Sequence, residues 1–196
     1  MKKFKGKYRT ESTRLQNWDY SGNGFYFITL VTYGRVCHFG DIIDGKMILN
    51  DFGKIASDEW YNSFKLRKEI NPRAFVLMPN HLHAIVGIKS SKHLFQSNDL
   101  LKSVDLQSIE MNGSSPKYGV AIRKPKSISS FVAGFKSAVI NKIDDLIDEQ
   151  NLSIKKFNRR NPLWQSNYHD SIIRDRGSYE RIMQYIQQNP EKWNEG

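Results

Sequence analysis

The sequence predicts an α+β fold in which helices pack on one face of a mainly antiparallel sheet. Three observations carry this prediction: an aromatic and β-branched run at 25–33, a strand-turn-strand unit around residues 79–80, and two long amphipathic helices. Strands and helices in this order favour a layer of helices on a sheet. The chain has 196 residues, enough for one core, so we expect a single domain over 1–196.

The first strand is expected at 25–33, because both of its alternating faces are apolar, as in a central strand covered on both sides. An Asp-Gly pair at 44–45 predicts a tight hairpin between strands at 41–43 and 46–49.

A helix capped by Asn50 or Asp51 is expected next, because apolar residues recur at three- and four-residue spacing. It should continue to about residue 70, where the Asn-Pro pair at 71–72 stops it. Short apolar runs at 74–78 and 84–88 then form the strand-turn-strand unit.

From residue 89 the periodic pattern is lost, and a polar insertion is expected at about 89–127. A second long helix follows at about 128–148, and the run 163–174 is expected to form a strand. A last helix should be capped near Ser178 and end at Pro190. With the helices on one face, the other face of the sheet would be free.

Composition indicates a polyanionic partner. Thirty Lys and Arg against twenty Asp and Glu give a net charge of +10 and a pI near 9.6. The single cysteine, Cys37, excludes a disulfide framework and a Cys-based zinc cluster. No stretch is apolar enough to cross a bilayer and no signal core follows the basic N-terminus, so we expect no membrane partner and a cytoplasmic location.

Two histidines, His81 and His83, follow directly after the turn of the strand-turn-strand unit. On an extended segment, side chains two residues apart point to the same face, so the pair could hold one divalent metal against the sheet. A lone His-x-His motif is more often structural, and this one gains weight only from the rest of the chain.

The last helix carries Tyr185 and Asn189, which are four residues apart and therefore share a face. A carboxamide oxygen can complete a two-imidazole metal site, and a phenol can attack phosphorus to form a covalent phosphotyrosine. Read alone, Tyr185 is a packing residue and Asn189 a helix stop before Pro190. Tyr168 and Tyr179 are competing nucleophiles by composition.

Several separated motifs occur in one order: Met78-Pro79-Asn80-His81-Leu82-His83, Leu163-Trp164-Gln165, the run 168–174, and Tyr185-Ile186-x-x-Asn189-Pro190. Together they resemble the single-tyrosine HUH transposase family. Within that family they most resemble the branch associated with repetitive extragenic palindromes, the REP-associated tyrosine transposases. The likeness runs from Tyr20 to the end of the chain, interrupted mainly by the insertion, which we cannot align.

The resemblance implies a ferredoxin-like (RRM-like) domain in which His81, His83 and Asn189 bind magnesium or manganese. It further implies that Tyr185 nicks single-stranded DNA in a hairpin-forming palindrome and transfers the strand through a 5′-phosphotyrosine intermediate. On donor chemistry alone, two imidazoles favour zinc, iron or manganese over magnesium. The expectation of magnesium or manganese therefore comes only from the family.

Four residues are expected to contact DNA: Lys126, Lys136, Trp164 and Arg174. Two other functions stay open: a non-catalytic nucleic-acid-binding protein on the same fold, and a metallonuclease in which water attacks. Whether the protein is a homodimer or a monomer is also left open.

Overall fold

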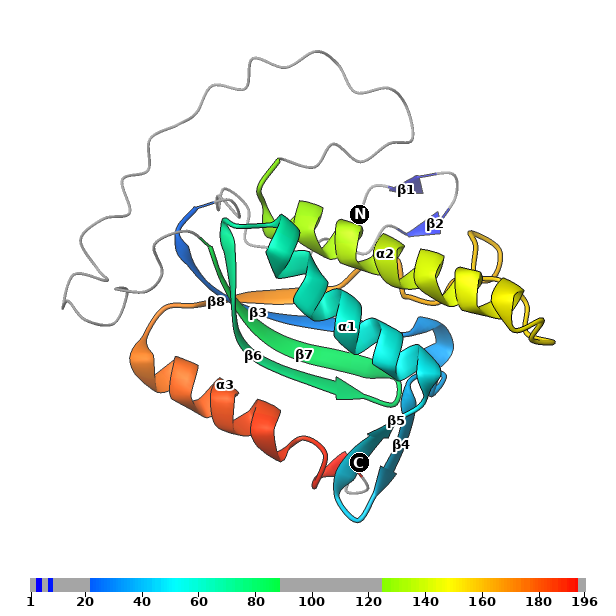
Figure 1. Ribbon diagram of the computed structural model, residues 1–196. Coiled ribbons are helices and arrows are strands. Elements are labelled where there is room, and N and C mark those ends of the chain that lie inside the picture. Colours follow the sequence, from blue (N-terminus) through cyan, green and yellow to red (C-terminus); the bar gives the residue numbers. More distant parts are fainter. Residues whose placement is uncertain (1–2, 5–6, 9–21, 89–124, 194–196) are drawn as a thin grey trace.

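The computed structural model describes residues 3–4, 7–8, 22–88 and 125–193, and it has the α+β architecture that the sequence predicts (Figure 1). Most of the expected insertion lies outside the described residues. In chain order the elements are β1 (Lys3–Phe4), β2 (Lys7–Tyr8), β3 (Gly24–Val31), a 3-10 turn (Tyr33–Arg35), β4 (Gly40–Ile43), β5 (Lys46–Leu49), α1 (Asp51–Leu66), β6 (Ile70–Met78), β7 (His81–Ile88), α2 (Ile128–Glu149), β8 (His169–Ile173) and α3 (Arg176–Gln188).

The main sheet has four strands in the order β6-β7-β3-β8, and every neighbouring pair is antiparallel. Along the chain these strands and two helices follow the order β3, α1, β6, β7, α2, β8, which is the ferredoxin-like arrangement. The expected fold class is therefore confirmed. β4 and β5 form the predicted hairpin before α1, and Asp44 and Gly45 both have positive φ, as a tight two-residue hairpin turn requires.

Alternate residues of β3 enter two separate apolar clusters. Tyr26 and Ile28 belong to the larger cluster, with buried residues of α1 and α2, whereas Phe25 belongs to a smaller cluster with Ile186 of α3. Successive side chains of a strand point to opposite faces, so the two clusters lie on opposite sides of the sheet. β3 is thus a central strand covered on both sides, as its sequence predicts.

The position of α3 differs from the expectation of one free face. α1 and α2 cover one face of the sheet, and α3 lies against the other (Figure 1). The smaller cluster explains this placement, because Ile186 packs there with Phe25, Ile85 and Ile173. The α3 face is where His81 and His83 must point, since Leu82 between them faces the larger cluster.

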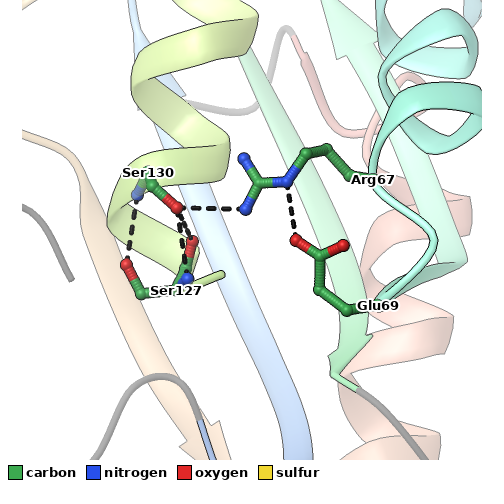
Figure 2. Close-up of polar contacts among 4 residues, drawn as sticks. All are labelled: Arg67, Glu69, Ser127 and Ser130. Atoms are coloured by element: carbon green, nitrogen blue, oxygen red, sulfur yellow. Dashed lines mark hydrogen bonds and ion pairs between the residues drawn. The ribbon is translucent and has the colours of Figure 1, made fainter. Parts of the chain in front are cut away.

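The polar residues that join α1, β6 and α2 are drawn in Figure 2. Ser127 caps α2, and reciprocal side-chain to backbone bonds with Ser130 form a capping box. Arg67, just after α1, donates to Ser130 Oγ at 3.0 Å and to Glu69 Oε1 at 2.6 Å. These contacts fix the start of α2 against the end of α1.

Three predicted element bounds are wrong, one of which is the N-cap of α3: it is Asp175 rather than Ser178. α1 ends at Leu66 rather than near residue 70, and the expected stop at 71–72 lies inside β6. β6 is an edge strand, which tolerates Pro72, and its pairing is irregular between Pro72 and Ala74. The strand expected over 163–174 covers only His169–Ile173. Among the described residues, no helix combines the length and the apolar character needed to cross a membrane.

Candidate active site

The His-x-His motif stands at the start of β7, as predicted. Met78 pairs with His81, which leaves Pro79 and Asn80 as the two residues of the turn. The rings of His81 and His83 lie 4.7 Å apart, centre to centre.

His83 is almost completely buried and has a partner at each ring nitrogen. Its Nδ1 lies 2.8 Å from Oγ1 of Thr29, the residue directly opposite on β3. Its Nε2 lies 3.1 Å from the hydroxyl oxygen of Tyr185 on α3. The ring of Phe27 stacks on the imidazole at 5.3 Å, so the orientation of the His83 ring is fixed on several sides.

His81 is held by groups from three parts of the chain. Its Nδ1 lies 2.7 Å from Oδ1 of Asn80, and the side-chain nitrogen Nδ2 of Asn80 donates to the backbone carbonyl of Arg35. The side chain of Asn189 hydrogen-bonds to His81. The indole of Trp193 stacks on the imidazole at 5.8 Å with 28° between the planes.

α3 therefore brings Tyr185 and Asn189 to the two histidines together. The helix begins after Asp175, whose carboxylate accepts from Ser178 N, and Asn189 is its C-cap residue. Ile186, between the two, is buried against the sheet, while Tyr185 remains 46% exposed. A phenol that is oriented by a histidine and also open to solvent can reach a substrate at the surface.

Burial keeps both imidazoles neutral at neutral pH. It lowers the pKa of His83 to about 3, and the nearby His81 lowers that pKa further. Burial also lowers the pKa of His81; the hydrogen bond that the Asn189 side chain accepts from the ring opposes this shift, and the charge of Arg35 adds to it. Neutral imidazole is the form that binds metals.

In the described part of the chain, no three side chains of His, Cys, Asp or Glu gather as metal ligands. A third protein ligand for a metal at His81 and His83 would therefore have to come from a residue of another type. The carboxamide of Asn189, already bonded to His81, has a suitable oxygen.

The competing tyrosines are placed elsewhere. Tyr168 packs against the larger cluster, with its hydroxyl 3.4 Å from Ser129 Oγ. Tyr179 packs against Phe25 in the smaller cluster, and burial raises the pKa of its phenol. Tyr185 is the tyrosine with a contact to His83.

The predicted DNA contacts divide into two groups. The structure contradicts Trp164, which is 4% exposed and packs between Phe39 and Phe135. Lys136 has a structural role, because its Nζ donates to the backbone carbonyls of Gln165 at 2.7 Å and Asn167 at 3.3 Å. Lys126 and Arg174 are exposed, and their contact with DNA stays a prediction.

Sequence reasoning missed the residues that surround the histidines: Thr29, Phe27, Arg35 and Trp193. Thr29 and Phe27 share a face of β3 with a spacing of two, so a β3–β7 pairing in the correct register would have identified them. No local signal marks Arg35 or Trp193, because each reaches His81 only through the tertiary fold.

A solved structure with the same fold is that of a REP-associated tyrosine transposase bound to a REP hairpin. It superposes with a TM-score of 0.55 over 95% of this chain and 75% of that chain, at 16% identity. The present protein is thus an α+β domain with the same fold as that structure, and it carries two histidines and a tyrosine on one face.

No family model matches the chain. A protein of Haemophilus influenzae that is described as uncharacterized is 32% identical over 190 residues, which cover 97% of this chain and 93% of that protein. The chain belongs to the same family as this Haemophilus protein.

Proposed function

We propose that the protein is a metal-dependent enzyme that nicks single-stranded DNA beside a hairpin and transfers the cut strand through a phosphotyrosine at Tyr185. The observation that carries the proposal is the 3.1 Å contact between the Tyr185 hydroxyl and His83 Nε2, with Asn189 bonded to His81 on the same face. The net charge of +10 supports a polyanionic substrate. The hairpin as substrate is inferred from the structural neighbour, which was bound to one.

The residues fit a divalent cation held by His81, His83 and Asn189. Both imidazoles are neutral, and each Nδ1 already faces a side-chain oxygen, as metal-binding histidines commonly do. When bound, the cation would neutralise charge that develops on the non-bridging oxygens of a phosphodiester. The family resemblance favours manganese or magnesium, and the two imidazoles favour manganese of these two.

In the proposed reaction, the Tyr185 oxygen attacks phosphorus and the bond from phosphorus to the 3′ oxygen breaks. The phenol loses one proton and the leaving 3′ oxygen gains one, so a 5′-phosphotyrosine and a free 3′ hydroxyl result. A 3′ hydroxyl of an accepting strand then attacks the phosphotyrosine and releases the phenol. One phosphodiester replaces another, so no nucleotide cofactor is required.

His83 would orient Tyr185 rather than remove its proton. A ring whose pKa burial holds at about 3 is a weak base at neutral pH. The neutral ring also has a single lone pair on Nε2, which can serve either the hydroxyl of Tyr185 or a metal. A cation held at this nitrogen and the 3.1 Å contact to the Tyr185 hydroxyl would therefore exclude each other.

The test is covalent capture of a nicked oligonucleotide. With a hairpin oligonucleotide and manganese, the wild-type protein should give an adduct that survives denaturing electrophoresis, whereas Tyr185→Phe should give none. Tyr185→Phe should still fold, because it loses one hydroxyl contact of a half-exposed residue, worth about 1 kcal/mol. Tyr168→Phe is the matched control, because its hydroxyl also makes a side-chain contact but lies away from His83.

The outcomes separate the proposal from its rivals. An adduct that persists in Tyr185→Phe, or that mass mapping assigns to Tyr168 or Tyr179, refutes the nucleophile assignment. Metal-dependent nicking with no adduct would identify a nuclease in which water attacks. Hairpin binding without nicking would identify a non-catalytic nucleic-acid-binding protein.

A further inference from the structure

β6 carries an irregularity that places an arginine on the α3 face of the sheet. The pairing of β6 with β7 shifts between Pro72 and Ala74, so Arg73 is the residue with no partner opposite it. A bulge of this kind can redirect a side chain. The guanidinium carbon of Arg73 lies 5.3 Å from the centre of the Phe25 ring, which belongs to the apolar cluster under α3.

The Nε atom of Arg73 is buried and has no hydrogen-bond partner among the residues that the structure describes. A buried donor of a charged group without an acceptor costs free energy, and such donors are rare in native proteins. The unmet Nε–H therefore points to an acceptor that the described chain does not supply.

A cleft of about 300 Å³ opens beside this arginine, between β6 and α3. Arg73, Ala74 and Val76 line it from β6, and Met183, Ile186 and Gln187 line it from α3. Apolar walls with a few polar groups are typical of sites for small ligands, and this volume is at the lower end of their range. We call it the β6–α3 cleft.

The β6–α3 cleft and the proposed nucleophile lie on opposite flanks of one helix. Met183 and Gln187 are four residues apart and share one flank of α3, whereas Tyr185 and Asn189 share the other. Ile186 lies between the flanks and faces the sheet. The flanks are separated by roughly the 10 Å diameter of a helix, which a short single strand can cover.

We propose that the β6–α3 cleft binds one unpaired nucleobase of the DNA strand that is cut at Tyr185. The guanidinium of Arg73 and the carboxamide of Gln187 would bond the base edge, and the apolar walls would contact its faces. A base fits better than a phosphate, because the aliphatic side chains of Val76, Met183 and Ile186 line the cleft beside its two polar groups, and a carboxamide both donates and accepts. The inference rests on the proposed function and makes this cleft a determinant of its sequence specificity.

The test uses a DNA hairpin with randomised single-stranded flanks on both sides. Hairpins bound by the protein are sequenced, and a base preference is derived for each flank position. The wild-type protein should prefer one base at one position. Gln187→Ala and Arg73→Ala should each weaken that preference roughly tenfold, the scale of a lost polar contact to a base, and should leave other positions unchanged.

Arg181→Ala is the matched control, because it removes a positive charge from the same helix. Arg181 is exposed, and its guanidinium donates to Ser178 at 2.9 Å, away from the cleft lining. It should reduce affinity for all flanks alike, if at all. Because Arg73→Ala could fail to fold, Gln187→Ala, at an exposed helical position, decides the question alone if necessary.

A second measurement replaces the preferred base with an abasic site. The wild-type protein should lose roughly tenfold in affinity, whereas Gln187→Ala, already lacking the contact, should lose much less. An unchanged preference in both cleft variants, or no preference at any flank position, would overturn the base site while leaving the proposed function intact. A wild-type protein that binds no hairpin at all would overturn both.

Discussion

The buried His83 predicts a specific loss of stability in acid. Burial, assisted by the nearby His81, holds the pKa of His83 at about 3 in the folded protein, whereas the ring titrates at 6.5 when it is exposed. Between these values the unfolded chain binds a proton that the folded protein does not bind. The free energy of unfolding must therefore fall as the pH falls below about 6.5, and above that pH the term is absent.

The size of this effect follows from the two pKa values. Each pH unit within the window costs about 1.4 kcal/mol for one ring. Near pH 5 the term amounts to about 2 kcal/mol relative to pH 8, and a folded pKa one unit higher changes this value little. The lowered pKa of His81 acts in the same direction.

The assay is urea unfolding at about pH 8 and pH 5, with a chelator present so that no metal binds the imidazoles. His83→Gln keeps a polar side chain opposite Thr29 but cannot titrate, so it removes this term. Other titrating groups are common to both proteins and cancel in the comparison. Between about pH 8 and pH 5, the free energy of unfolding should fall by about 2 kcal/mol more in the wild-type protein than in the variant. Equal losses would mean that the ring is accessible to solvent and is not held as the structure places it.

Three further substitutions test the metal site, the docking of α3 and the role of Lys136. Asn189→Ala should weaken manganese binding more than tenfold by titration calorimetry, and an unchanged affinity would remove Asn189 from the ligands. Ile186→Ala should lower the free energy of unfolding by about 2 to 4 kcal/mol, because the side chain is 2% exposed, whereas Leu66→Ala, at 83% exposed, should change it by less than about 0.5 kcal/mol. Lys136→Ala should destabilise the protein by about 1 kcal/mol, because the bond to the Gln165 carbonyl is lost. It should leave the salt dependence of DNA binding unchanged, as should the control Lys142→Ala. A shallower salt dependence for Lys136→Ala alone would identify Lys136 as a phosphate contact.

Much of the site could be predicted because it depends on backbone periodicity alone. A spacing of two residues on a strand places His81 and His83 on one face. A spacing of four residues on a helix places Tyr185 and Asn189 on one face. The turn at Pro79 also fixed where β7 begins, since only two residues separate the paired strands. These features need no knowledge of the tertiary fold.

The prediction failed where the answer depends on packing at long range. The apolar stripe of α3 shows that the helix has a buried side, but it does not say which face of the sheet receives it. The two apolar faces of β3 contained that information, because Phe25 needs a cover as much as Tyr26 does. The end of α1 was misjudged for a similar reason: Pro72 would stop a helix, yet an edge strand accepts it.

The two halves of the candidate site are held with different strength. The histidines stand on β7, whose other side chains contribute largely to the main core, so their positions depend on the fold as a whole. Tyr185 stands on α3, which rests on a much smaller cluster around Ile186. Local opening has its lowest free energy where apolar contacts are few, so α3 should detach more readily than β7 moves. A substitution in the small cluster would therefore separate the phenol from the imidazoles while the imidazole pair stays intact. Loss of DNA cleavage with retained metal binding is the signature that such an arrangement produces.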